Sequence, residues 1–429
     1  MRMVLKGGRV VDPATGTDGH LDVLIADGII ARIGRDLPVD GAEVIELAKG
    51  WIVAPGLLDI HVHLREPGQE HKETVATGTA AAVAGGFTAV ACMPNTDPVN
   101  DHAGITQFIL KKAAETGVAR VYPIGAVSLG SRGEQLAELG ELKNAGCVAF
   151  SDDGRPVATA LLMRRALEYA GMLGVPIVDH CEDPSLTGDG VAHEGYHASA
   201  LGLRGIPGVA ESLMVERDVA LAEMTGAHVH ICHMSARQSL RAVRAGKERG
   251  VRVTCEVTPH HFTLTDAALE SGVPYDTNLK MNPPLRDEAD RDAMLDGIAD
   301  GTVDVIATDH APHHADEKMV EFDRAPFGIT GLETAVPLVF DRLVHTGRVT
   351  VRRAIELLSS NPARVLNLPG GSLAVTAPAD VVVLDPERRV RVDAARQRTR
   401  SRNTPFHGWE LRGAVALTLV AGRAVYRAE

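Results

Sequence analysis

Cysteine is scarce in this sequence. Only 5 Cys occur among 429 residues, and none forms a Cys-x-x-Cys pair. An odd and scattered set excludes a disulfide framework and predicts reduced, buried thiols in the cytoplasm. The first residues, MRMVLKGGRVVDP, lack the apolar core of a signal peptide, so we expect no export.

Positive charge and long apolar runs are also in short supply. The sequence has 44 Lys and Arg against 56 Asp and Glu, a formal net charge of −12. Duplex nucleic acid and anionic membrane surfaces are therefore not expected partners, because both require a basic face. The longest uncharged run, 74–96, is broken by Gly85-Gly86 and Pro94. It predicts a buried helix followed by a strand, not a transmembrane segment.

Apolar residues are present in an ordinary globular proportion. Hydrophobic residues make up 45% and charged residues 23%, which excludes disorder and fibrous structure. Residues 1–54 consist of short alternating segments with turns, and residues 371–429 repeat that texture. We predict that the two ends form one small β-sandwich domain. Residues 55–370 alternate strand-like and helix-like stretches, so the predicted class is α/β.

The segment 55–370 contains eight strand candidates. They are LLDIHVH, FTAVACM, RVYPIGAV, CVAFSDD, VPIVDHC, HVHICHM, VRVTCEV and VDVIATDH. Eight parallel strands joined by helical crossovers predict a (β/α)8 barrel of the TIM type. In one unit we expect a strand at 229–233, a helix capped by Ser235 that ends at Gly250, and a strand at 251–257.

Histidines and aspartates recur at the carboxyl ends of these predicted strands, where barrel enzymes carry catalytic groups. His61 and His63 lie two apart on the first strand, so both side chains project to one side and can bind one metal ion. Asp152 and Asp153 follow the fourth strand, and only one of them can point inward. The fifth, sixth and eighth strands end at His180, His233 and Asp309. Four histidines and two carboxylates predict a site for two divalent ions of the Zn type, bridged by a carboxylate.

Such a pair of ions activates water and polarises a carbonyl, which predicts hydrolysis of an amide-like bond or its reversal. Asp309 is the candidate to shuttle a proton between water and the leaving nitrogen. Arg65 suits bidentate capture of a substrate carboxylate. Asn95 and Asn282 can bond a ring amide, and His313 follows the last strand. Hydrogen bonds that stabilise loops are the alternative role for the last four residues.

Two further expectations concern the surroundings of the site. His230 and Cys232 have the opposite parity to His233 on their strand, so we expect them to face away. Residues 314–327 are polar and charged, which is typical of a mobile loop over the barrel mouth or of a solvated surface segment.

Five motifs resemble those of the cyclic amidohydrolases, and most closely those of class I dihydroorotases. They are DIHVHLR, MPNT, FSDDG, NPPLR and ATDHAPH, in that order. The resemblance covers essentially the whole chain, including the sandwich. It implies a metal-dependent (β/α)8 barrel that interconverts N-carbamoyl-L-aspartate and L-dihydroorotate in pyrimidine (UMP) biosynthesis.

The resemblance also assigns roles to residues. It implies two Zn²⁺ ions per chain, one on His61, His63 and Asp309 and one on His180 and His233, with Asp153 as the bridge. It implies Asp309 as the catalytic acid/base. The implied substrate contacts are Arg65, Asn95, Asn282, His313 and the backbone of Phe327 and Gly328.

Hydantoinases and allantoinases bridge their metals with a carbamylated lysine at the end of strand four. No lysine stands there in this sequence, so an aspartate bridge is expected, and Asp153 is chosen over Asp152 by family spacing alone. The alternatives are a hydantoinase-type or allantoinase-type cyclic amidase and a non-catalytic dihydroorotase-like subunit. We expect a cytoplasmic homo-oligomer, for which aspartate carbamoyltransferase is a further candidate partner.

Overall fold

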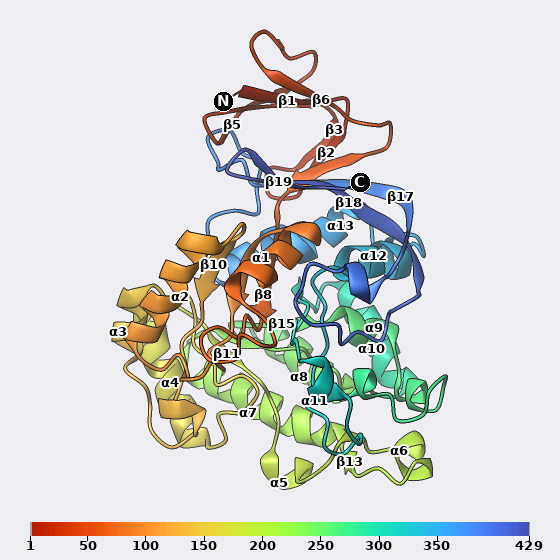
Figure 1. Cartoon of the computed structure of the whole chain (residues 1–429). Helices are drawn as coiled ribbons and strands as arrows, with labels where there is room; N and C mark the ends of the chain where they lie inside the picture. Colours follow the sequence, from red (N-terminus) through yellow and green to blue (C-terminus); the bar gives the residue numbers. More distant parts are fainter. Residues whose placement is uncertain (1, 429) are drawn as a thin grey trace.

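Strands from both chain ends gather at one end of the molecule. The computed structural model describes residues 2–428. Figure 1 shows these strands above the helices that the middle of the chain forms, with both termini at the strand-rich end. Among the described residues, no helix combines the length and the apolar character that a membrane crossing requires.

Two sheets make up the strand-rich end. One has the order β5-β4-β1-β6 and the other β19-β18-β17-β7-β2-β3. The strands of the first are β1 (Arg2–Lys6), β4 (Asp22–Ala26), β5 (Ile29–Gly34) and β6 (Glu43–Glu46). Those of the second are β2 (Arg9–Asp12), β3 (Thr17–His20), β7 (Ile52–Pro55), β17 (Val381–Arg391), β18 (Glu410–Val420) and β19 (Arg423–Arg427). β17 pairs antiparallel with β7, with Val381 opposite Pro55, which confirms that the two chain ends pair.

β17 joins the end sheets to the rest of the protein. Side chains two apart on a strand lie on one face. Val381 and Val383 accordingly belong to a buried cluster with Met3 of β1, whereas Val382 and Leu384 belong to the large core of the middle segment. Burying both faces of the first part of β17, Val381 to Leu384, anchors the C-terminal part of the chain on the helical part.

The middle of the chain forms two parallel sheets, β10-β9-β8 and β11-β14-β15-β16. Their strands are β8 (Leu57–Val62), β9 (Phe87–Cys92), β10 (Arg120–Pro123), β11 (Ile177–Asp179), β14 (Val229–Ile231), β15 (Val253–Val257) and β16 (Val305–Ile306). The predicted fourth strand is present only as Phe150, which makes single parallel bridges to Gly125 and Ile177. A further bridge joins Val62 to His310, so pairing continues from each sheet to the other.

Helices connect these strands. They are α1 (Val75–Ala84), α2 (Ala103–Thr116), α3 (Leu139–Ala145), α4 (Ala160–Leu173), α5 (Pro184–Thr187), α6 (Tyr196–Ala200), α7 (Gly208–Thr225), α8 (Arg237–Glu248), α9 (Pro259–Thr263), α10 (Glu288–Asp300), α11 (Ala315–Lys318), α12 (Ala335–Val339), α13 (Val351–Ile355) and α14 (Asn361–Val365). A short parallel pair, β12 (Ala192–His193) and β13 (Gly205–Ile206), lies in the loop between α5 and α7.

The unit of β14, α8 and β15 tests the local predictions. Leu240 and Val243 of α8 are buried, as their spacing predicts. The prediction that Ser235 caps this helix is wrong. The cap position is Ala236, which has no polar side-chain atom. The Ser235 hydroxyl donates to the carboxylate of Glu211 on α7, and its oxygen accepts from Arg286 Nε at 3.0 Å.

Candidate metal centre

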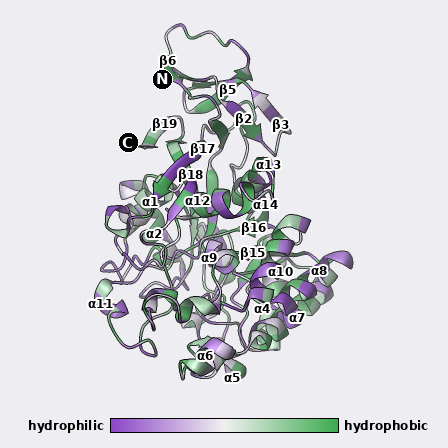
Figure 2. Ribbon diagram, turned by 90° about the vertical axis from the view of Figure 1, so that its right-hand side faces the viewer, coloured by the Kyte–Doolittle hydropathy of each residue, from purple (hydrophilic) through white to green (hydrophobic). Residues whose placement is uncertain are grey.

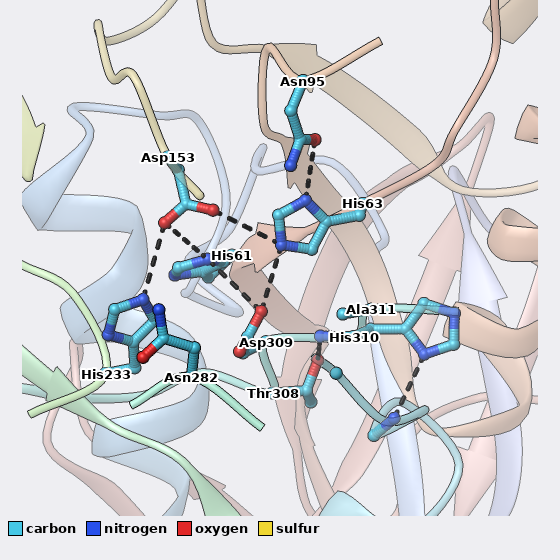
Figure 3. Close-up of polar contacts among 12 residues, drawn as sticks. His61, His63, Asn95, Asp153, His233, Asn282, Thr308, Asp309, His310 and Ala311 are labelled. Carbon is cyan, nitrogen blue, oxygen red and sulfur yellow. Dashed lines mark hydrogen bonds and ion pairs between the residues drawn. The ribbon is translucent and has the colours of Figure 1, made fainter. Parts of the chain in front are cut away.

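Four histidines and two aspartates converge on one buried point beyond the carboxyl ends of the parallel strands, as Figure 3 shows for five of them. The cluster consists of His61, His63, Asp153, His180, His233 and Asp309, none more than 6% exposed. Potential ligand atoms of His61, His63 and Asp309 lie within 4.8 Å of one another. The same holds for Asp153, His180 and His233. The cluster therefore divides into two groups of three.

Asp153 faces both groups. Its oxygens lie 3.4 Å from His61 Nε2, 3.5 Å from His63 Nε2, 3.6 Å from His180 Nδ1 and 3.5 Å from His233 Nε2. Asp152 lies elsewhere, because its carboxylate accepts hydrogen bonds from the backbone N–H of Ser128 at 2.9 Å and from the Ser128 hydroxyl. Of the two adjacent carboxylates, only Asp153 faces both groups of the cluster.

The donor set of the cluster fits divalent cations. His61 Nε2 and Asp153 Oδ1 are buried and have no hydrogen-bond partner within residues 2–428, yet they lie 3.4 Å apart. An unsatisfied buried polar atom costs about 1–3 kcal/mol, so two of them side by side indicate a missing common partner. Imidazole nitrogens and carboxylate oxygens are ligands that zinc-type ions prefer.

Burial and neighbouring charges oppose one another in this cluster. Burial lowers the pKa of His61, but the carboxylates of Asp153 and Glu256 outweigh it and raise the pKa well above the ordinary value. Burial raises the pKa of Asp309, but the hydrogen bond with His63 and the charges of His61 and His63 lower it to about 2. Asp309 is therefore a carboxylate near neutral pH.

Glu256 of β15 forms hydrogen bonds that hold two histidines of the cluster in place. It is fully buried, and His61 Nδ1 donates to its Oε1 at 2.5 Å. The same carboxylate accepts from His230 Nε2 at 3.0 Å and from the backbone N–H of His233 at 3.2 Å. A carboxylate behind a histidine fixes the ring orientation and leaves Nε2 free to bind a metal ion.

The expectation that Cys232 faces away from the site is wrong. Its sulfur lies within 4.8 Å of ligand atoms of His61 and Asp153. β14 ends at Ile231, and His233 has a φ of 26°, so the alternation of side chains does not extend past the strand end. His230 remains inside the strand, where it contacts the Glu256 carboxylate and not the ligand atoms.

Two predicted substrate residues contact histidines of the cluster directly. Asn95 Oδ1 lies 2.9 Å from His63 Nδ1, a contact drawn in Figure 3. Asn282 Nδ2 lies 3.3 Å from His180 Nε2 and donates to Glu182 Oε2 at 2.7 Å. The two amides thus lie at opposite histidines of the cluster.

The other predicted substrate residues form a second group. Arg65 Nη2 lies 3.4 Å from His313 Nε2, which also lies 2.8 Å from the carbonyl oxygen of Phe327. Burial lowers the pKa of Arg65 to about 10, which leaves the guanidinium charged at neutral pH. His313 Nδ1 is buried without a hydrogen-bond partner in the described chain. Gly328 has a φ of 122°, and a Cβ there would lie 2.6 Å from Ala311 Cβ, so only glycine fits.

The segment 314–327, for which a mobile loop and a solvated surface segment were the two expectations, is mostly exposed and is bonded by two buried lysines. Lys280 Nζ donates to the carbonyl oxygens of Phe322 at 2.8 Å and Asp323 at 3.0 Å. Lys318 Nζ donates to the carbonyl oxygen of Pro326 at 2.8 Å. These bonds hold the backbone that leads into Phe327.

Relatives of this chain carry one recurring description. A family model described as dihydro-orotase-like matches residues 50–239, and one described as amidohydrolase family matches residues 323–426. The dihydroorotase of Syntrophotalea carbinolica is 56% identical over 427 residues, covering 100% of this chain and 99% of that protein. This chain belongs to the dihydroorotase family. The dihydroorotase of Pelotomaculum thermopropionicum is 55% identical over 425 residues, covering 99% of this chain and 98% of that protein.

Solved structures similar to this dihydroorotase-family chain come from hydantoinases. The L-hydantoinase of Arthrobacter aurescens superposes with a TM-score of 0.89 at 23% identity, over 99% of this chain and 96% of that one. The D-hydantoinase of a Thermus species gives 0.84 at 28% identity, over 99% and 95%. The fold is thus the mixed α/β fold of the amidohydrolases, and the chain is a metal-dependent cyclic amide hydrolase.

Sequence reasoning missed three residues that support the site of this dihydroorotase-family chain. Asp59 accepts the backbone N–H of His61 at 3.1 Å and that of Thr308 at 3.2 Å, and Glu256 and Asn403 hold other site residues. Glu256 carried a usable signal, since a charged residue inside the apolar strand VTCEV requires a buried partner. Asn403 lies far along the chain in a polar segment that gives no such signal.

Proposed function

We propose that this chain is a class I dihydroorotase that interconverts N-carbamoyl-L-aspartate and L-dihydroorotate in pyrimidine biosynthesis. The carrying observation is the buried cluster in which Asp153 faces all four histidines. Relatives named dihydroorotase at 56% and 55% identity support the assignment.

Two Zn²⁺ ions are part of the proposal. His61, His63 and Asp309 would hold one ion and His180 and His233 the other, and Asp153 would contact both. When bound, such ions polarise the amide carbonyl and lower the pKa of water.

Proton transfer falls to Asp309. Its Oδ1 lies 3.1 Å from His63 Nε2, so the carboxylate is held at the cluster. In hydrolysis it takes a proton from the attacking water and delivers it to the ring nitrogen that leaves. In cyclisation it takes the proton from the attacking carbamoyl nitrogen and delivers it to the hydroxyl that leaves as water.

Substrate orientation falls to the two groups of polar residues. Arg65 and His313 would bind the exocyclic carboxylate, because a charged guanidinium lies 3.4 Å from Nε2 of a buried imidazole. Asn95 and Asn282 would form hydrogen bonds with the ring amides. The backbone of Phe327 and Gly328 would contact the substrate as well.

The proposal extends to architecture and setting. The bridges at Phe150 and His310 support closure of the parallel strands into a (β/α)8 barrel at 55–370. The cluster shared by the two end sheets supports a β-sandwich made of 1–54 and 371–429. Five buried free cysteines agree with a cytoplasmic protein. A homo-oligomer and association with aspartate carbamoyltransferase complete the proposal.

An assay of the purified protein with L-dihydroorotate, hydantoin and allantoin side by side, together with metal counting, tests the proposal. We expect turnover of L-dihydroorotate and two zinc ions per chain. Preferred turnover of hydantoin or allantoin would favour the amidase type, to which the structural neighbours belong. Bound metal with no turnover of any substrate would favour the structural subunit.

A further inference from the structure

A separate cavity lies at the strand-rich end of the helical part. Its volume is about 460 Å³, and its lining contains none of the candidate site residues. The lining comes from β17, β18 and the end of β19, from 392–398, from α12 and the two residues before it, and from the end of α1. Sites for small molecules occupy roughly 300–1,000 Å³, and this cavity lies within that range.

Positive charge is concentrated in this cavity, although the chain as a whole has a net charge of −12. Six arginines line it: Arg388, Arg389, Arg391, Arg396, Arg398 and Arg427. Two acidic residues, Glu333 and Asp393, share the lining. Glu333 accepts the backbone N–H of Arg398 at 2.8 Å and of Thr399 at 3.1 Å, and Asp393 accepts that of Ala395 at 3.0 Å. The acids are thus engaged by the backbone.

The arginines share the lining with apolar residues. Arg389 and Arg391 lie two apart in a regularly paired part of β17, so their side chains project to one side. Figure 2 shows hydrophilic ribbon at β17 and β18 beside α12. The apolar residues Pro337, Val392 and Val415 also line the cavity. Arginines and apolar residues in one lining suit an anion that carries an organic part.

We propose that this cavity binds a small polyanion of the triphosphate class, either a nucleoside triphosphate or inorganic triphosphate. A guanidinium pairs bidentately with phosphate oxygens. Guanidiniums from three segments of the chain match several adjacent phosphates better than a single carboxylate. The proposal concerns binding only and is independent of the proposed catalytic activity.

Calorimetric titration of the full-length protein with inorganic triphosphate and with a nucleoside triphosphate tests the proposal. We expect saturable binding at an ionic strength of about 0.1 M, weakened by added salt. The double variant Arg389→Ser with Arg427→Ser should bind about tenfold more weakly or worse, because each loses charge-assisted bonds. The corresponding double Lys variant keeps the charge, so it should lose less affinity than the Ser pair. If the Ser pair proves unstable, the Lys pair replaces it in the test.

Arg241→Ser is the matched control. Arg241 is an exposed arginine that lines another cavity, of about 240 Å³, together with Asp292 and Asp296. This variant should bind triphosphate as the wild type does. Equal affinity for both probes would assign binding to the phosphates. Tighter binding of the nucleoside form would show that the apolar lining residues contribute as well.

Three results would overturn the proposal. The first is the absence of saturable binding of either probe. The second is an equal loss in the Arg241→Ser control, which would show nonspecific attraction. The third is binding of a polyglutamate peptide as tightly as triphosphate, which would identify a docking surface for an acidic protein.

Discussion

Asn403 holds the backbone of His313. The His313 N–H donates to Asn403 Oδ1 at 3.1 Å, and Asn403 Nδ2 donates to the carbonyl oxygens of Ala311 at 3.1 Å and Gly328 at 3.0 Å. Asn403 is 4% exposed. One side chain from the C-terminal part of the chain thus joins the two loops that carry candidate substrate groups.

Replacing Asn403 with Ala should impair substrate binding more than chemistry. Three hydrogen bonds are lost, so we expect KM for L-dihydroorotate to rise about tenfold, with a smaller change in kcat. Thr404→Val is the control, because Thr404 is equally buried at 4% and its hydroxyl oxygen accepts from Phe406 N–H instead. An unchanged KM in Asn403→Ala would contradict the positioning role.

Glu256→Gln should weaken metal binding. The amide keeps the shape of the side chain but no longer supports a charged hydrogen bond to His61 Nδ1. Loss of a carboxylate partner behind a metal ligand lowers metal affinity about 10- to 100-fold. Zinc analysis after dialysis against a chelator measures this directly, and the exposed Glu248→Gln serves as control. Equal zinc retention in the two variants would reject the role of Glu256.

Asp309→Asn should abolish most turnover. An amide cannot accept the proton, and general acid–base catalysis contributes roughly 10²- to 10⁴-fold to rates. Steady-state kinetics with L-dihydroorotate measure the loss, and metal content determined on the same sample separates lost proton transfer from lost metal. Near-normal turnover would reject Asp309 as the shuttle.

Arg65→Met should discriminate between substrates. If Arg65 binds the exocyclic carboxylate, kcat/KM for L-dihydroorotate should fall about 100-fold, the range expected when a charged hydrogen bond is lost. A cyclic amide of the same ring without the carboxylate should be turned over as by the wild type. An equal loss for both substrates would show that Arg65 only supports the loops, through its contacts with Pro312 and His313.

Lys318 should make stability depend on pH. Burial and then the charge of Lys280 lower its pKa from the ordinary 10.5 to about 7. Between these values the unfolded chain binds more protons than the folded one, so stability rises with pH across this window. Urea unfolding at pH 7 and pH 9 should show a gain on the order of 1–2 kcal/mol larger in the wild type than in Lys318→Met. Parallel changes in both proteins would contradict it.

Periodicity along the chain predicted the main elements because it depends on local rules. The buried pair Leu240 and Val243 lies on α8 as its spacing requires, and β17 pairs with β7 as the repeated texture of the chain ends suggested. The helix-capping rule failed at Ser235, because residues outside the helix bond its hydroxyl. Ser235 bonds Glu211 and therefore does not cap α8.

The sequence by itself determined which side chains could meet, because residues at the carboxyl ends of parallel strands share one edge whatever the connections between them. That rule placed His61, His180 and Asp309 together without a structure. Only the tertiary structure decided which atoms face one another: that Asp153 and not Asp152 lies among the histidines, and that Glu256 and Asn403 hold them from behind. Backbone turns past the strand ends and contacts across hundreds of residues set these choices, and neither follows a sequence period.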